Sequence, residues 1–267
     1  MNLSGQAFAE WNRRIAQASN AVGQPDFPTL LTDSMRVVTD FQICMTFSYG
    51  ADNQVCCLDH NMTKKKATII VQHYLRGPYL LDPFYQEVLR GRIDGSCALS
   101  EISPDRFYSS DYFKHHYVHT EIGDEVGIFF PISDAETAVL SFTRPNRKQR
   151  FSLAECKRIA AVVPMIRSLA IQHYGITPSG ENFAALPGMK RSMIESAFGQ
   201  FGSDLLTVRE SQIASFVLKG HSTNSISDHL KISVETVKSH RKNAYAKLNI
   251  SSQAELFSIF LSSLENL

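Results

Sequence analysis

Basic side chains gather in one short stretch near the C-terminus. Between Lys231 and Lys247 the sequence holds five basic residues and a single acid, Glu235. The formal net charge of the whole chain is only +1, so this positive charge is local. Lys and Arg side chains release condensed counterions when they bind phosphates, and long donor-bearing side chains on an exposed helix reach base edges in the major groove. The pattern predicts a local contact with double-stranded DNA.

The residues around this stretch predict three short helices. Thr207 and Glu210 form a capping box at the start of the first helix, and Gly220 ends it. A second helix of about two turns follows, and Ser233 caps the third, which carries the basic residues. Two short helices joined by such a tight connection form a helix-turn-helix.

Between Leu206 and Leu248 the sequence contains, in order, the motifs L-T-x-R-E, G-x-S-T, I-S-x-x-L-x-I-S-x-x-T-V-K-x-H and N-x-x-x-K-L. This region resembles the LuxR-type DNA-binding domain, which usually has alanine at the position of Ser227 and often glycine at the position of Lys231. The resemblance implies that Lys238, Ser239 and Lys242 face bases. It places Thr223, Ser233, Thr236, His240 and Lys247 nearer phosphates, and allows Arg241 either role.

The family's fourth helix matches Gln253 to Leu261. In this segment Leu256, Phe257 and Phe260 predict an apolar surface that pairs with a second copy of the chain. We therefore expect a homodimer that binds a two-fold DNA site with half-sites about one helical turn apart. RNA polymerase is a further expected partner. The alternative is a helical bundle with a solvated basic face, which explains the charge but not the caps and the turn together with it.

The longer segment N-terminal to these helices is expected to form a separate domain. A chain of 267 residues with 43% apolar content is long enough for two domains. Aromatic and β-branched residues predict strands, and apolar spacing predicts helices around them. Strands are expected at Phe41 to Tyr49 and within Val126 to Phe142; helices at Phe8 to Gly23, Thr29 to Val38, Lys66 to Leu75, Asp82 to Leu89, Arg106 to His119 and Ser152 to Tyr174. Ser152 and Glu155 predict a capping box at the start of the last helix, and Pro164 should kink that helix.

Glycine, proline and polar residues from Gly175 to Gly188 predict a linker, followed by a short helix from Met189 to Phe198. The expected fold class is α+β. The expected domains are an α-β-α sensor over residues 1–174, a linker with a short helix over 175–201 and a four-helix DNA-binding domain over 202–267.

The N-terminal domain also contains a set of residues in a characteristic order: Ile70, Tyr74 and Asp82, then Gly127 and Pro131 within GIFFP. It resembles the autoinducer-binding domain of quorum-sensing LuxR-type regulators. That resemblance implies an α-β-α sandwich that holds an acyl-homoserine lactone, with a tryptophan, a tyrosine and an aspartate at the lactone. Tyr74 and Asp82 match, but Ile70 stands at the tryptophan position and offers no indole N–H. We therefore expect a different small-molecule effector.

Aromatic side chains around a single anion suit a ligand with an amine or a hydroxyl group. The expected pocket residues are Ile70, Tyr74, Tyr79, Asp82, Phe84 and Tyr85. The alternative is that these aromatic rings pack as core and that Asp82, which precedes Pro83, only caps the following helix.

A metal site is the next alternative. His115 and His119 could share one helical face, with Asp111 or Glu121 adding an oxygen ligand. Surface histidines that hydrogen-bond to neighbours are the commoner outcome. We therefore expect neither a metal nor another cofactor.

Catalysis is a further alternative, because Cys56 or Cys57 with His60 could act as nucleophile and base. Adjacent positions rarely converge in this way, and a buried cysteine behaves as a small hydrophobe. The sequence has no G-x-S-x-G motif and no glycine-rich phosphate loop. We expect no catalytic residues and no enzymatic activity.

Two other kinds of N-terminal domain are alternatives to a ligand-binding domain. A receiver domain needs an acidic pair after its first strand, which the first fifty residues lack. A protein-interaction or dimerisation module without a ligand remains open.

The sequence also predicts the cellular compartment of the protein. The five cysteines form no C-x-x-C pair, the N-terminus lacks a signal-peptide core, and the apolar stretch from Ile159 to Ile171 is too short to cross a bilayer. We expect a cytoplasmic protein without membrane contact.

Overall fold

An antiparallel sheet with the strand order β3-β4-β5-β1-β2-β6 forms the centre of the first domain. The computed structural model describes residues 4–50, 55–145, 150–176, 183–184, 201–202 and 204–265. The strands are β1 Ile43–Gly50, β2 Val55–His60, β3 Ser96–Ala98, β4 Asp124–Ser133, β5 Glu136–Arg144 and β6 Phe183–Ala184.

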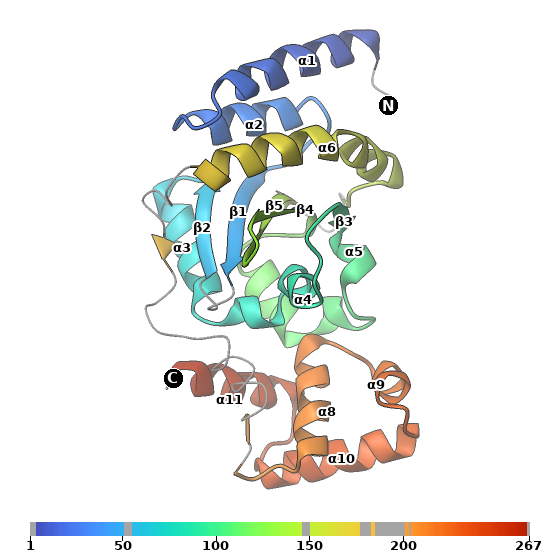
Figure 1. Ribbon diagram of the computed structural model, residues 1–267. Helices are drawn as coiled ribbons and strands as arrows, with labels where there is room; N and C mark the ends of the chain where they lie inside the picture. Colours follow the sequence, from blue (N-terminus) through green and yellow to red (C-terminus); the bar gives the residue numbers. More distant parts are fainter. Residues whose placement is uncertain are drawn as a thin grey trace.

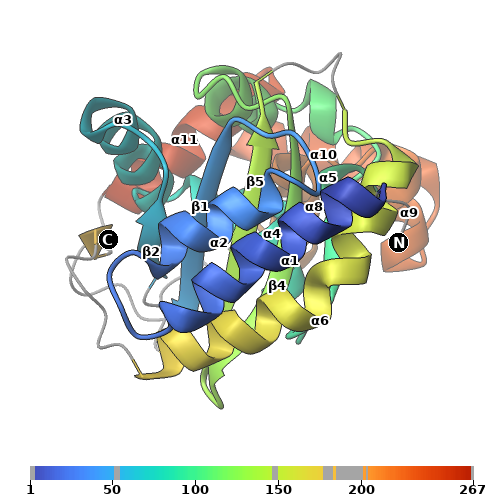
Figure 2. The same cartoon turned by 90° about the horizontal axis from the view of Figure 1, so that it is seen from above.

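Three helices cover one face of this sheet (Figures 1 and 2). They are α1 Gly5–Asn20, α2 Phe27–Met35 and α6 Leu153–Ile176. Trp11, Phe27 and Ile166 of these helices belong to one apolar cluster with Ile128 and Phe130 of β4. The sequence predicted each of these helices to within a few residues, because each has a clear apolar stripe.

Shorter helical pieces cover the other face and complete the predicted α-β-α sandwich (Figure 1). They are α3 Lys64–Leu75, a 3-10 helix Pro78–Leu81, α4 Pro83–Leu89, α5 Leu99–Ile102, a 3-10 helix Phe107–Ser109 and a π-helix Phe113–Val118. Most of their apolar side chains belong to a second cluster, which also contains apolar residues of the C-terminal helices.

The single helix expected from Arg106 to His119 is wrong, because Ser110 divides it. The Ser110 backbone is extended, with φ −68° and ψ 156°. Its hydroxyl donates to the Phe107 carbonyl at 2.6 Å and accepts from the Phe113 N–H at 3.1 Å. A serine that ends one turn and caps the next favours two short pieces over one helix.

Strands β2 and β3 were not predicted from the sequence. β3 has only three residues, and β2 ends in the polar pair Asp59 and His60. Neither shows the alternation that marks a strand in isolation, and both depend on backbone pairing with β1 and β4.

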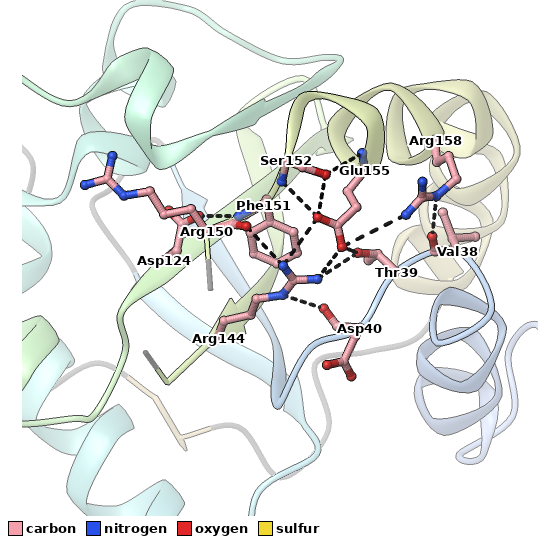
Figure 3. A network of polar contacts seen from close by, with 10 residues as sticks. All are labelled: Val38, Thr39, Asp40, Asp124, Arg144, Arg150, Phe151, Ser152, Glu155 and Arg158. Atoms are coloured by element: carbon pink, nitrogen blue, oxygen red, sulfur yellow. Dashed lines mark hydrogen bonds and ion pairs between the residues drawn. The ribbon is translucent and has the colours of Figure 1, made fainter. Parts of the chain in front are cut away.

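A buried ion pair attaches the start of α6 to the sheet (Figure 3). Arg144 at the end of β5 meets Glu155 at 2.5 Å and donates to the Asp40 carbonyl at 2.8 Å. Arg158, one turn along α6, donates to the Val38 carbonyl at 3.0 Å. Burial disfavours ionisation of Glu155, but hydrogen bonds from Arg144 and Ser152 outweigh it and lower the pKa of this carboxyl to about 2.

The predicted capping box of α6 is confirmed. The Ser152 N–H donates to Glu155 at 2.8 Å, and the Glu155 N–H donates to the Ser152 hydroxyl at 3.3 Å. The helix continues through Pro164 to Ile176. Within the described residues α6 is the one helix long and apolar enough to cross a membrane, and here its apolar face packs on the sheet.

Four helices form the C-terminal unit (Figure 1): α8 Val208–Lys219, α9 Thr223–Leu230, α10 Val234–Lys247 and α11 Gln253–Glu265. The predicted capping box of Thr207 and Glu210 is present, and Gly220 ends α8 with φ +90°. The predicted linker from Gly175 to Gly188 and the helix from Met189 to Phe198 lie almost entirely outside the described residues.

The two units are in direct contact. The Arg106 N–H donates to the Gly220 carbonyl at 3.0 Å, and the Ser222 N–H donates to the Asp105 carboxylate at 2.9 Å. A Cβ added at Gly220 would lie 3.0 Å from the Phe107 Cα, so this close approach requires glycine.

The apolar surface expected on α11 is wrong as a pairing surface. Leu256, Phe257 and Phe260 are 0%, 3% and 0% exposed. Phe260 packs against the Phe201 ring at 5.5 Å, and Phe257 stacks on His115 of the first domain at 5.3 Å. An apolar stripe marks a buried helix face, but it does not say which partner covers it.

Candidate nucleic-acid interface and buried cavity

Helix α10 lies at the end of the molecule opposite α1 and α2 (Figure 1). Val237 and Ala244 fix its inner face in the core. Lys238, Ser239 and Lys242, which were expected to face bases, are all exposed. Ser233, expected near phosphate, is exposed, while Thr223, Thr236, His240 and Arg241 are half-buried.

A groove of about 560 Å³ runs beside the C-terminal half of α10. Lys238, Arg241, Lys242 and Tyr245 line one wall, at the spacing of one helix face. The turn from Ile250 to Gln253 lines the other wall. The groove therefore offers three cations on one surface, an arrangement suited to a polyanion.

Lys247 has a partner within the chain. Its Nζ lies 2.7 Å from the Glu210 carboxylate, which also accepts the Thr207 N–H at 2.8 Å. The hydrogen bond from Lys247, followed by that from Thr207, lowers the pKa of Glu210 to about 2. Lys247 thus ties the end of α10 to the start of α8, a contact that no sequence pattern predicted.

Both departures from the family pattern fit the turn between α9 and α10. The Ser227 hydroxyl donates to the Ile232 carbonyl at 2.7 Å, which satisfies a carbonyl in the turn. Lys231 adopts the left-handed conformation, with φ +54° and ψ +45°. Glycine meets that conformation with less strain, which explains its frequent occurrence there in the family.

A small cavity lies between the sheet and the short helical pieces on the face opposite α1, α2 and α6. Four of the six predicted pocket residues line it: Ile70, Tyr74, Asp82 and Phe84. The other lining residues are Met45, Phe47, Tyr49, His116, Tyr117, Glu125 and Ser141. Its free volume is about 10 Å³, about the room that one water molecule needs.

Hydrogen bonds connect the polar groups of this cavity. The Tyr74 hydroxyl donates to Asp82 at 2.5 Å and lies 2.8 Å from the Tyr49 hydroxyl. The other Asp82 oxygen accepts the Phe84 N–H at 2.8 Å, so this residue caps α4 as well as facing the cavity. Burial raises the pKa of Asp82, against the effect of these hydrogen bonds.

Tyr79 and Tyr85 do not line the cavity but support its wall. Their rings meet edge to face at 5.2 Å, and Tyr85 also packs against Tyr49 at 5.2 Å. Both are buried. Their expected ligand contacts remain a prediction for a rearranged pocket.

Sequence reasoning missed Glu125 and His116. Glu125 precedes Gly127 by two positions on β4, and alternate residues of a strand share a face. Gly127 faces the cavity side, because a Cβ there would lie 2.6 Å from the Phe84 ring. The period of two, applied to the GIFFP motif, would have placed Glu125 on the same side.

The alternative of a metal site built on His115 and His119 finds no support in the structure. His115 stacks on Phe257, while His119 lies near His73 with ring centroids 6.0 Å apart. Within the part of the chain that the structure describes, no group of three His, Cys, Asp or Glu side chains is placed to hold a metal ion.

The cysteine nucleophile also lacks a suitable setting. Burial raises the pKa of the Cys57 thiol, which disfavours the thiolate that attacks a substrate. This thiol donates weakly to the Asp59 carbonyl at 3.5 Å.

Comparison with known proteins gives three findings. Residues 204–260 match the family "Bacterial regulatory proteins, luxR family". A protein of Aeromonas salmonicida named "Putative HTH-type transcriptional regulator in exeN 3'region" is 36% identical over 186 residues, which are 68% of this chain and 94% of that protein. The crystal structure of the VqsR LBD domain from Pseudomonas aeruginosa has a TM-score of 0.56 at 21% identity, over 63% of this chain and 99% of that one.

Proposed function

Because the chain belongs to the luxR family of bacterial regulatory proteins, we propose that it binds a specific DNA sequence as a homodimer in the cytoplasm, under control of a small molecule. The basic face of α10 carries this proposal. Five basic residues fall within one helix and the turn before it, and α10 lies at the end of the molecule opposite α1 and α2. A two-fold operator with half-sites about one helical turn apart matches such a dimer.

The roles of the individual side chains follow from their exposure. Lys238, Ser239 and Lys242 extend from the outer face of α10 and contact base edges. The remaining residues expected at the interface position α10 on the sugar-phosphate backbone of the DNA. These are Thr223, Ser233, Thr236, His240 and Lys247, with Arg241 in the basic groove able to do either.

The cavity of the first domain is the proposed effector site. Ile70 lines it where the autoinducer-binding pattern has tryptophan, so the effector is not a standard acyl-homoserine lactone. The π-helix Phe113–Val118 provides a route to the DNA-binding unit. His116 of this helix lines the cavity, while the preceding residue, His115, stacks on Phe257 of α11. A ligand that displaces His116 therefore shifts the contact with α11.

DNA binding itself is tested with the purified full chain and a pool of random duplexes. We expect selection of one two-fold sequence and an affinity that falls steeply with salt. Failure to bind any duplex at low salt, with or without effectors, overturns the proposal.

The small size of the cavity favours a second candidate for the first domain, an interaction module with no ligand. Thermal unfolding against a metabolite panel separates the two, because a ligand selective for the folded state raises the midpoint. If no compound raises the midpoint or shifts DNA affinity, the interaction module is the better explanation.

A further inference from the structure

The effector cavity contains two buried carboxyl groups from different elements. Asp82 comes from the start of α4 and Glu125 from β4, and they are 6% and 4% exposed. The residues described as lining the cavity include neither lysine nor arginine. A buried pair of acids without a cation is costly, because both groups cannot ionise in a low-dielectric site.

Glu125 is the less satisfied of the two acids. Glu125 accepts the Tyr117 hydroxyl at 3.1 Å and has a side-chain hydrogen bond with Ser141, whereas Asp82 accepts the Tyr74 hydroxyl and the backbone N–H groups of Phe84 and Tyr85. Burial, followed by the negative charge of Asp82, raises the pKa of Glu125. The free protein therefore holds a proton on this pair where a cation would otherwise lie.

One of the residues that line this cavity, His116, has an unpaired imidazole nitrogen. His116 lines the cavity and is 4% exposed, and its Nδ1 has no hydrogen-bond partner. Burial, together with nearby His73 and His119, lowers the pKa of His116 to about 3. The ring is thus neutral and does not act as the counter-ion, but its unused nitrogen remains available for a hydrogen bond to a ligand.

We infer that the effector is an organic cation, a protonated amine whose ammonium group lies between Asp82 and Glu125 with its third N–H directed at His116. This inference rests on the proposed ligand control. The rings of Phe47, Tyr74 and Tyr117, which also line the cavity, offer cation–π contacts to the same group. The positive charge of the ammonium group allows Glu125 to release its proton to solvent, and the aromatic side chains move apart to admit the rest of the ligand.

The test uses n-alkylamines from methylamine to hexylamine, with the n-alkanols and n-alkanoates of the same chain lengths as controls. Alkylamines are protonated at neutral pH, as lysine is. The thermal midpoint of the full chain is measured for wild type, Glu125→Gln and Glu136→Gln. Glu136 lies on β5 outside the lining residues and serves as the matched control.

We expect at least one amine to raise the midpoint of wild type and of Glu136→Gln, while the matching alkanol and alkanoate do not. Glu125→Gln should fold with an unchanged or higher midpoint and should bind that amine about tenfold more weakly or worse. Equal stabilisation by alkanols, equal amine binding by Glu125→Gln, or no amine that binds better than its alkanol overturns the cation proposal.

A second readout separates this inference from ligand control. Operator affinity is measured with and without the amine that binds. Amine binding without a change in operator affinity preserves the cation site and contradicts ligand control. If only neutral compounds shift operator affinity, ligand control is supported and the cation site is contradicted.

Discussion

Lys247 has two roles to account for, an expected phosphate contact and an ion pair within the chain. The family pattern assigns it to a phosphate, while the structure pairs it with the buried carboxylate of Glu210. Its side chain keeps 41% exposure, so it can reach a phosphate while it remains near Glu210. Lys242 is exposed on the basic face of α10. These two lysines should therefore differ in what their removal changes.

We predict that Lys242→Ala lowers operator affinity more than affinity for random DNA, by about 1–3 kcal/mol, because it removes a base contact. Lys247→Ala should weaken binding to both duplexes alike and reduce the salt slope by about 1. It should also lower the thermal midpoint, because Glu210 loses its cation. Anisotropy titrations at several salt concentrations and thermal unfolding measure these effects. Equal loss of discrimination in both variants contradicts the role assignment.

Glu125 gives a second prediction at the residue scale, from its raised pKa. Asp82, Tyr117 and Asp124 are the titratable groups that act on it. The folded state keeps the Glu125 proton at pH values where the unfolded chain has lost it. Its contribution to stability is therefore full below the usual glutamate pKa and is lost as pH rises through the raised value.

The free energy of unfolding of wild type should therefore fall relative to that of Glu125→Gln as pH rises above 5, by up to about 1.4 kcal/mol per pH unit. Urea unfolding between pH 5 and 9 measures the difference. Comparison with the variant removes the contributions of groups that do not interact with Glu125. A constant difference over this range would show that Glu125 titrates normally.

At the scale of elements, the sequence predicted what local chemistry determines. Thr207, Ser152 and Ser233 cap helices where their side chains predicted it, because a cap needs only its own next turn. The region from Arg106 to His119 was misjudged, because Ser110 and the packing of its aromatic rings divide it. The edge strand β3 and the cavity residue Glu125 depend on partners far along the chain. Propensity does not contain that information.

The attachment of α6 to the sheet can be tested by Glu155→Gln. This change leaves Arg144, a buried cation, without its carboxylate. Loss of one partner of a buried pair costs 3–5 kcal/mol, and the partial exposure of Glu155 reduces this to about 2 kcal/mol. Trp11, the only tryptophan, is buried in α1 beside α6, so its fluorescence reports the loss during urea unfolding. Glu136→Gln is the control, and an equal effect there argues against the ion pair.

At the scale of the whole molecule, the N-terminal α-β-α domain and the DNA-binding unit share one apolar cluster. The segment from Asp105 to His115 makes further contacts between the two units. Asp105 accepts the Ser222 N–H, and His115 stacks on Phe257. Units joined in this way unfold together when the interface free energy is comparable with the stability of the weaker unit.

We predict that wild type shows a single calorimetric transition and that the double variant Asp105→Ala, His115→Ala shows two. Each lost contact is worth about 1 kcal/mol, and together they weaken the coupling of a C-terminal unit of marginal size. The variant Asp26→Ala, at the start of α2 on the other side of the sheet, should keep the single transition. Because the same segment joins the cavity to α11, the double variant should also bind operator with an affinity that an effector no longer changes. Retention of both the single transition and the effector response would show that this segment does not transmit the signal.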